Sequence, residues 1–331
     1  MERFALAAAV VLGFALTAAL CSLFVPLRRV LERREQNQQP AQSEQPRPAP
    51  LRAPLWGGLC AAAGTVAAVG VGWLAACVGQ PELLGSEGRL MTRLLTALAG
   101  SLAFGAVGLA EDLARMRSPA ALGLRRDVRL LLEALAAAFV LLLLQAAGCL
   151  PRGLDVPGAG YVLLGSAVPF LWAVLMVALA ECARIAERDE GTVCGAAFVA
   201  MLALMMAEAG LGVPGLAVLP AALAGALVAL LLWAFPPARL GVGCCGSLLA
   251  AGAIGCIPLS LDMTSLTVPL ALPFWAAGGL LAAQLLCAKR TGKPLRCWVK
   301  KHKMSPETVF LCSFALSAVG YVLALALLRW C

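Results

Sequence analysis

Long apolar stretches separated by short polar segments dominate the sequence. Each stretch has about 18–23 residues, which is enough for a helix to cross a hydrocarbon core of about 30 Å. Ten such stretches predict an all-α integral membrane protein, with about ten transmembrane helices in one bundle. They lie approximately at residues 4–25, 55–77, 91–110, 129–147, 161–183, 192–211, 214–235, 241–258, 266–288 and 308–328.

The composition supports a single polytopic membrane domain over residues 1–331. Hydrophobic residues make up 61% of the chain and charged residues only 13%, which is too apolar for an ordinary soluble core. Residues 35–53 are polar and rich in Gln and Pro, so they predict a flexible cytoplasmic linker. The first stretch predicts an anchor and not a cleaved signal peptide, because Arg28 and Arg29 follow the apolar run.

The basic residues predict the orientation in the membrane. All but five of the 26 Lys and Arg residues lie in or beside alternate loops, at residues 26–54, 111–128, 184–191, 236–240 and 289–307. The exceptions are Arg3, Arg89, Arg93, Arg152 and Arg329. Because basic loops remain in the cytoplasm, both termini are expected on the extracytoplasmic side. The net charge of +8 is therefore mainly a topology signal, and nothing in it points to a nucleic acid partner.

The 13 cysteines predict buried small apolar side chains more than a metal or redox site. Most lie within apolar stretches, there is no Cys-x-x-Cys pair, and His302 is the one histidine. The adjacent Cys244 and Cys245 are the pair that could have a further role.

The first candidate site is Glu111, Asp112 and Arg115, at the end of an apolar stretch. On a helix these side chains lie within about one turn, so they could meet a cation or a phosphate. A solvated helix end with a Glu111–Arg115 pair is the simpler alternative.

Three further segments carry candidate chemistry. Residues 181–191 contain four carboxylates and two arginines, and Glu181 and Arg184 could pair with each other or line a site. Residues 235–247 are rich in glycine, which suits either phosphate binding or close helix packing. Residues 289–303 form the most basic loop, which could bind a pyrophosphate or anchor the chain.

The order and spacing of these motifs resemble the polyprenyl-phosphate N-acetylhexosamine-1-phosphate transferases (glycosyltransferase 4 type), most closely the phospho-N-acetylmuramoyl-pentapeptide transferase (MraY-type) branch. Residues 53–58 (Ala-Pro-Leu-Trp-Gly-Gly) are similar to the Thr-Pro-Thr-Met-Gly-Gly of that family. Residues 108–115 fall on Gly-x-x-Asp-Asp-x-x-Lys, followed by the Gly-Leu at 123–124. Residues 237–238 and 243–247 fall on Pro-Ala and Gly-Asp-x-Gly-Ser, and residues 291–293 on Thr-Gly-Lys.

The resemblance implies transfer of a phospho-sugar from a UDP-sugar to undecaprenyl phosphate, with release of UMP and with Mg²⁺ as cofactor. It places the reaction at the cytoplasmic face of a bacterial inner membrane and, by analogy, suggests a homodimer. Carried over by position, the expected catalytic residues are Glu111, Asp112 and Glu187, and the metal positions are Glu111, Asp112 and Cys244. The expected substrate-binding residues are Arg115, Arg184, Glu190, Lys293 and His302.

Several positions depart from the family pattern. Where the family has Asp-Asp, this chain has Glu111 and Asp112, and where the family has lysine it has Arg115. These changes keep the charges but alter the length and geometry of the side chains. The Asp of Gly-Asp-x-Gly-Ser is Cys244, and a thiolate is a poor substitute for an oxygen ligand of Mg²⁺. The family's His-His-His segment is absent and only His302 remains.

Three hypotheses therefore stay open from the sequence: a transferase with a degenerate, rebuilt site, a non-catalytic homologue that binds a lipid carrier or an envelope-assembly partner, and an unrelated ten-span transporter. The transporter predicts ionisable residues at mid-membrane depth, whereas the charges found in the sequence gather at the cytoplasmic ends.

Overall fold

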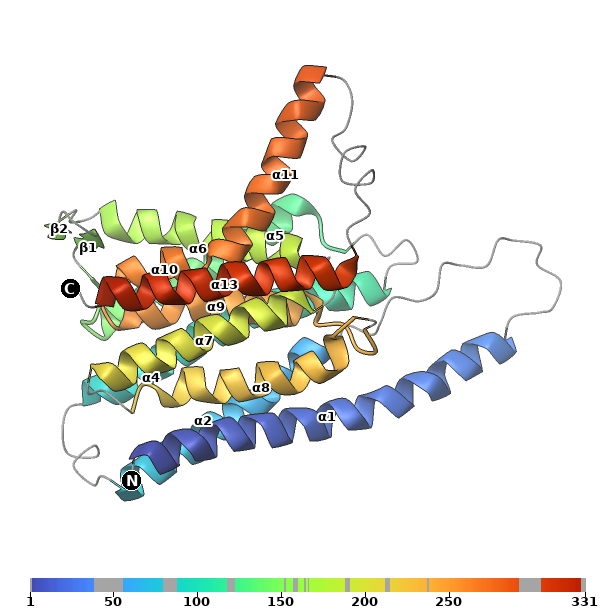
Figure 1. The fold of residues 1–331 in the computed structure, drawn as a ribbon, viewed down its shortest axis with the longest axis horizontal. Helices are drawn as coiled ribbons and strands as arrows, with labels where there is room; N and C mark the ends of the chain where they lie inside the picture. Colours follow the sequence, from blue (N-terminus) through green and yellow to red (C-terminus); the bar gives the residue numbers. More distant parts are fainter. Residues whose placement is uncertain are drawn as a thin grey trace.

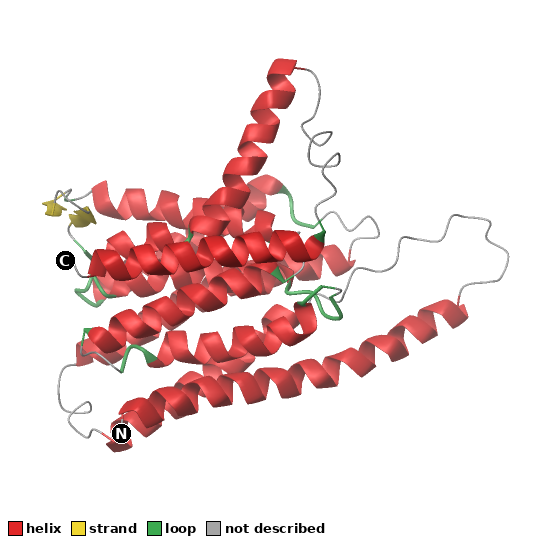
Figure 2. Ribbon diagram, viewed as in Figure 1, coloured by secondary structure: helices red, strands yellow, loops and turns green. Residues whose placement is uncertain are grey.

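The computed structural model describes most of the chain. The described residues are 2–38, 56–79, 88–117, 123–151, 153–156, 160–163, 165, 167–187, 191–211, 215–236, 238–291 and 305–328. Figures 1 and 2 show a bundle of helices with one short hairpin of strands at one end.

The helices have the following bounds: α1 Glu2–Gln38, α2 Gly57–Gly79, α4 Gly88–Arg117, α5 Arg126–Ala146, α6 Ala167–Ala186, α7 Thr192–Gly210, α8 Val218–Ala234, α9 Gly243–Ser260, α10 Thr267–Leu270, α11 Leu272–Thr291 and α13 Pro306–Leu328. The 3₁₀ turn η1 (Thr264–Leu266) precedes α10. The strands β1 (Gly153–Val156) and β2 (Gly160–Leu163) pair antiparallel, with Gly153 opposite Leu163.

A helix occupies most of each of the ten predicted apolar stretches, and apart from the short hairpin the described chain is an all-α multi-pass membrane protein. The stretch predicted at 161–183 is wrong at its start, because residues 161–163 belong to β2 and α6 begins at Ala167. Seven helices of the described chain are long and apolar enough to cross a membrane, or eight with one bent pair. The bent pair corrects the predicted continuous span at 266–288, because residues 264–270 and 272–283 meet at 61°. Pro269 and Pro273 flank this break, and proline removes a donor from the helical ladder. At the other end of the chain, α1 continues to Gln38, four residues into the predicted linker, and the remainder of that linker lies outside the described residues.

Helix α9 forms the centre of the bundle. Every residue of Gly243–Ser260 is buried, and α9 packs against α2, α4, α6 and α7. A helix that is apolar on all sides, as this one is, can be buried on all sides. In contrast, α11 projects away from the other helices (Figure 1).

The start of α9 is held by close backbone contacts. The N–H groups of Gly57 and Gly58, at the start of α2, donate to the carbonyls of Gly241 (3.2 Å) and Val242 (2.8 Å). A Cβ atom at Gly58 would overlap the backbone nitrogen of Gly246. Glycine here lets two helices approach at backbone distance, as in other membrane bundles.

We expect Gly58→Ala to destabilise the protein by about 1–3 kcal/mol, because the added methyl group overpacks a backbone contact that has no flexible side chain to yield. The midpoint of thermal unfolding in detergent, followed by circular dichroism, measures the effect. Gly70→Ala in the same helix is the matched control, since a Cβ there meets nothing within 4 Å. Equal midpoints for the two variants would contradict the packing seen at Gly58.

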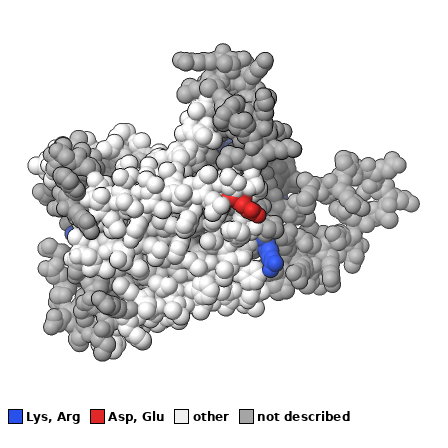
Figure 3. Space-filling model, in the orientation of Figure 1, with Lys and Arg blue, Asp and Glu red and all other residues white. Residues whose placement is uncertain are grey.

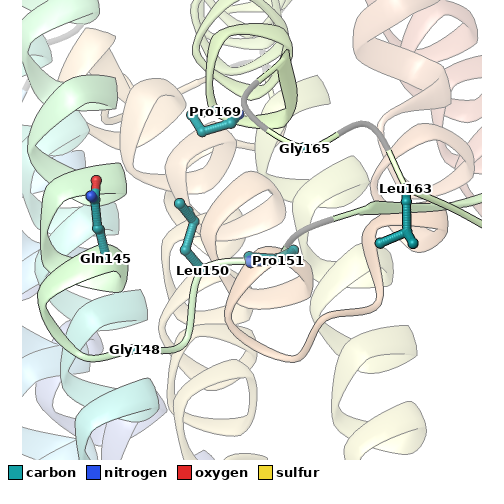
Figure 4. Close-up of a pocket in the computed structure, with 7 residues that line it drawn as sticks. All are labelled: Gln145, Gly148, Leu150, Pro151, Leu163, Gly165 and Pro169. Atoms are coloured by element: carbon teal, nitrogen blue, oxygen red, sulfur yellow. The ribbon is translucent and has the colours of Figure 1, made fainter.

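The opposite end of the bundle carries the hairpin and an apolar cavity of about 660 Å³. Six of the seven residues that line it are apolar or glycine, and Gln145 is the polar one (Figure 4). The cavity lies between the end of α5, the hairpin and the start of α6, where it offers no group suited to acid–base or phosphate chemistry. The chemistry predicted from the sequence lies at the other end of α5 and α6.

The exterior of the bundle suits contact with lipid. In the view of Figure 3, most of the described surface is uncharged, and acidic and basic side chains are visible mainly toward one end. Large apolar side chains such as Phe4, Leu142 and Phe170 are exposed on the outside. A monomeric soluble protein rarely exposes so much apolar surface, which supports membrane insertion.

Candidate active site

Eight charged residues and one thiol meet at one end of the bundle, where α4 and α6 end and α5 and α9 begin. We call the eight charged residues the charged cluster: Glu111, Asp112, Arg115, Arg129, Glu133, Glu181, Arg184 and Glu187. The thiol is that of Cys244, which donates a hydrogen bond to one member of the cluster. Because alternate helix ends in an up-and-down bundle lie on the same side, residues remote in sequence are brought together.

Asp112 binds the start of α9. Its two carboxylate oxygens accept hydrogen bonds from the backbone N–H groups of Cys244 (3.0 Å) and Cys245 (2.9 Å). These groups lie at the helix N-terminus, which lacks intrahelical partners and carries a partial positive charge. Gly243 adopts φ 72°, a left-handed conformation that favours glycine. The side chain of a different helix therefore caps α9.

Glu187 and Cys244 lie beside that cap. The Cys244 Sγ donates to the Glu187 Oε2 at 3.0 Å. One ligand atom each from Asp112, Glu187 and Cys244 lies within 4.8 Å of the others. We call these three residues the ligand triad. The resemblance predicted all three as site residues, and the fold brings them together from α4, the end of α6 and α9.

Arg115 connects the carboxylates of the site. Its guanidinium donates to Glu111 Oε1 at 2.7 Å and lies 3.8 Å from both Asp112 Oδ1 and Glu187 Oε2. The Glu111–Arg115 pair considered from the sequence is therefore present, but it belongs to a larger network. The Glu111 side chain is buried, and its Oε2 has no hydrogen-bond partner among the described residues.

A second part of the network is centred on Arg129 in α5. Its Nε donates to Glu181 Oε1 (2.8 Å), and its guanidinium lies 3.6 Å from Glu111 and 3.8 Å from Glu133. Arg184 donates to the other Glu181 oxygen at 2.7 Å. The pairing of Glu181 with Arg184 is thus confirmed, and Arg129 links that pair to the rest of the cluster.

Sequence reasoning did not assign Arg129 or Glu133 to the site. Both are buried in the first turns of α5, and neither carboxylate oxygen of Glu133 has a hydrogen bond within the described chain. Arg129 and Glu133 are four residues apart, so they lie on one face of the helix, in a stretch that is otherwise apolar. An isolated pair of opposite charges inside a predicted membrane span could have indicated that both residues face the bundle interior, because charged residues seldom face lipid.

The predicted site residues now divide into two groups. Those brought together by the fold are Glu111, Asp112, Arg115, Arg184, Glu187 and Cys244. The predicted substrate contacts Glu190, Lys293 and His302 lie outside the described residues.

Glu208 corrects the sequence interpretation that all the ionisable residues gather at the cytoplasmic ends. It is buried near the end of α7, the helix that starts beside the charged cluster, so it lies toward the opposite end of the bundle. Its Oε2 has no hydrogen-bond partner among the described residues. The sequence did contain a signal, because Glu208 is a carboxylate inside an otherwise apolar predicted span.

The ligand triad does not fit Mg²⁺, the ion that the resemblance implies. Mg²⁺ requires nearly octahedral oxygen ligands, and thiolate is a soft ligand that suits other metals. Here two carboxylates and a thiol converge, and the thiol stands where the family has a carboxylate. The donor set can hold a divalent cation, but its chemistry differs from that of an all-oxygen magnesium site.

Several known proteins are similar to this chain in sequence. A phospho-N-acetylmuramoyl-pentapeptide-transferase of Mycobacterium tuberculosis (strain ATCC 25618 / H37Rv) is 28% identical over 265 residues, which cover 72% of each chain. The protein of that name from Desulforudis audaxviator (strain MP104C) is 32% identical over 170 residues, 48% of this chain and 50% of its own. The one from Synechococcus sp. (strain RCC307) is 30% identical over 212 residues, 63% and 55% of the two chains. The family model of glycosyl transferase family 4 matches residues 94–262. These residues include the end of α4, the end of α6 and all of α9, and the chain belongs to that family.

Proposed function

We propose that this chain is a membrane phosphosugar transferase of peptidoglycan-precursor synthesis in the bacterial cytoplasmic membrane. It transfers a phospho-N-acetylmuramoyl-pentapeptide or phospho-N-acetylhexosamine group from a UDP-sugar to undecaprenyl phosphate and releases UMP. The observation that carries the proposal is the convergence of Asp112, Glu187 and Cys244 beside Arg115, at helix ends inside the region matched by the family. The names of the relatives support the choice of substrates.

The reaction makes and breaks one bond to phosphorus. An oxygen of the lipid phosphate bonds to the β-phosphorus of the UDP-sugar, while the bond from that phosphorus to the bridging oxygen breaks. UMP leaves with the electron pair. Two anions must approach each other, so fixed positive charge at the reacting oxygens is the main need.

The chain's own residues supply that charge and one proton acceptor. Arg115 and Arg184 each release a carboxylate partner and bind a phosphate of the substrate in its place. Guanidinium can bind either group in bidentate geometry. The Glu187 side chain is 12% exposed, against 2% for Asp112, so it is the triad carboxylate more accessible to substrate. Glu187 accepts the proton of a protonated lipid phosphate at Oε1 or Oε2.

The proposal includes the orientation and the partners predicted from the sequence. The charged cluster faces the cytoplasm, where a soluble nucleotide and a lipid headgroup can meet. α1 begins and α13 ends at the other end of the bundle, the end that also carries the hairpin (Figure 1), which supports extracytoplasmic termini. Glu190, Lys293 and His302 remain proposed substrate contacts. The homodimer is likewise a proposal, by analogy with the family.

UMP release from purified full-length protein in lipid nanodiscs tests the function. The assay contains undecaprenyl phosphate, either UDP-N-acetylmuramoyl-pentapeptide or UDP-N-acetylglucosamine, and Mg²⁺, Mn²⁺ or Zn²⁺ in separate reactions. We expect turnover with one donor and a loss of at least about 100-fold in Glu187→Gln, the usual scale for removing a general base. Glu307→Gln, an exposed carboxylate at the start of α13, is the matched control and should retain full activity.

The second candidate function is that of a non-catalytic homologue that binds a lipid carrier or an envelope-assembly partner. The observation in its favour is that Arg115, Arg129 and Arg184 are all paired with carboxylates of the chain itself. Binding of undecaprenyl phosphate without UMP release, for both donors and all three metals, would support this function and overturn the transferase proposal.

A further inference from the structure

We propose that the ligand triad is a site for a thiophilic divalent cation of the zinc class, and that Cys244 sets this preference against Mg²⁺. This inference rests on the proposed function only in placing the metal at the same site. Metal binding itself is measured without turnover.

The geometry brings together the donor types that zinc binds. Carboxylate oxygen and thiolate sulfur are both ordinary zinc ligands, with bonds of roughly 2.0 to 2.3 Å, so neighbouring ligands of one ion lie about 3 to 4 Å apart. The three triad atoms already lie within 4.8 Å, with Sγ and the Glu187 oxygen at 3.0 Å. Only side-chain adjustments are needed for them to share an ion. Asp112 can take part while it caps α9, because each carboxylate oxygen keeps a second lone pair.

Charge around the triad favours a cation. The charged cluster contains five carboxylates and only three guanidinium groups: Glu111, Asp112, Glu133, Glu181 and Glu187 against Arg115, Arg129 and Arg184. Glu111 is buried and has one oxygen without a hydrogen-bond partner in the described chain. A divalent cation bound to the triad neutralises carboxylates that are largely buried, where solvation by water is weak.

The hydrogen bond between Cys244 and Glu187 marks the position that the ion takes. On binding, the S–H bond of Cys244 breaks, its proton passes to solvent, and a sulfur–metal bond forms. The Glu187 oxygen loses the thiol proton as its partner and gains the metal. Three protein ligands are the number typical of catalytic zinc sites, which leave the fourth position open for water or substrate oxygen.

Metal binding to the full-length protein in nanodiscs tests the inference. We expect isothermal titration calorimetry to show one Zn²⁺ per chain, with release of about one proton counted from the dependence of the enthalpy on the buffer. Co²⁺ as a probe should produce a thiolate-to-metal charge-transfer band. Cys244→Ser should lose that band and weaken Zn²⁺ binding at least about tenfold, since even outer-shell changes cost about 10–100-fold. Cys244→Asp should shift the preference from Zn²⁺ toward Mg²⁺.

Cys245→Ser is the matched control, because its backbone N–H also bonds to Asp112 but its thiol is outside the triad. It should keep the band and the affinity. Zn²⁺ binding that is equal in the wild type and Cys244→Ser, or no Zn²⁺ binding in either, would overturn the inference. The two proposals fail separately: Zn²⁺ binding without UMP release contradicts the transferase alone, whereas Mg²⁺-supported turnover that Cys244→Ser leaves unchanged contradicts the zinc site alone.

Discussion

Arg129→Met is expected to lower the free energy of unfolding by about 3–5 kcal/mol. Arg129 is buried and pairs with Glu181 at 2.8 Å, with Glu111 and Glu133 close by. Glu111 and Glu181 keep Arg115 and Arg184 at 2.7 Å when the guanidinium is removed, but buried Glu133 loses the cation beside it. Breaking a buried pair by removing one partner costs about 3–5 kcal/mol. Equilibrium unfolding in mixed micelles, with an increasing fraction of denaturing detergent, measures the free energy of unfolding.

Arg126→Met provides the matched control, since Arg126 is exposed at the start of the same helix and should change stability by less than about 0.5 kcal/mol. The double variant Arg129→Met/Glu181→Gln should be more stable than Arg129→Met alone, because the second change neutralises a carboxylate that has lost one of its two guanidinium partners. A double variant whose losses simply add would show that the Arg129–Glu181 pair is not coupled.

Asp112→Ala is expected to destabilise the protein by about 3 kcal/mol or more. Two hydrogen bonds from backbone N–H groups to a carboxylate are lost, each worth about 1.5–3 kcal/mol, and both N–H groups stay buried. The central helix α9 loses the group that caps its N-terminus. Asp112→Asn keeps one acceptor oxygen, so it should lose about half as much. The same unfolding measurement compares the two variants.

This structural role changes how an inactive Asp112 variant should be interpreted. Loss of UMP release in Asp112→Ala can follow from a displaced start of α9 as well as from a lost ligand. Asp127→Ala, at an exposed carboxylate near the start of α5, is the stability control and should behave as the wild type. Unchanged stability of Asp112→Ala would contradict the capping role.

Much of the fold could be predicted from the hydrophobic pattern. An apolar stretch long enough to span a bilayer must satisfy its backbone groups internally, so it forms a helix wherever it occurs. The positions of charges at the ends of these stretches then indicate which loops share a side of the membrane. Family motifs added the expectation that Asp112, Glu187 and Cys244 lie in one site, and the structure brings them within 4.8 Å.

The break between α10 and α11 shows the limit of that pattern. The stretch at 266–288 is apolar throughout, so its length predicts one continuous span, yet two segments meet there at 61°. Proline disfavours a regular helix, but the angle depends on what the two segments pack against. A hydrophobic pattern contains no information about that packing.

The amino-acid pattern alone predicts an all-α membrane bundle and the helix ends that carry its charges. It does not predict which groups meet: Asp112 with the backbone of Cys244 and Cys245, 132 and 133 positions along the chain, and Arg129 with Glu181, 52 positions along. These partners depend on how each helix is rotated about its own axis. Helices that are apolar on nearly every side, such as α9, have no polar stripe that orients them. Close backbone packing, of Gly58 against Gly246 and of Gly108 against Cys244, then decides which groups face each other.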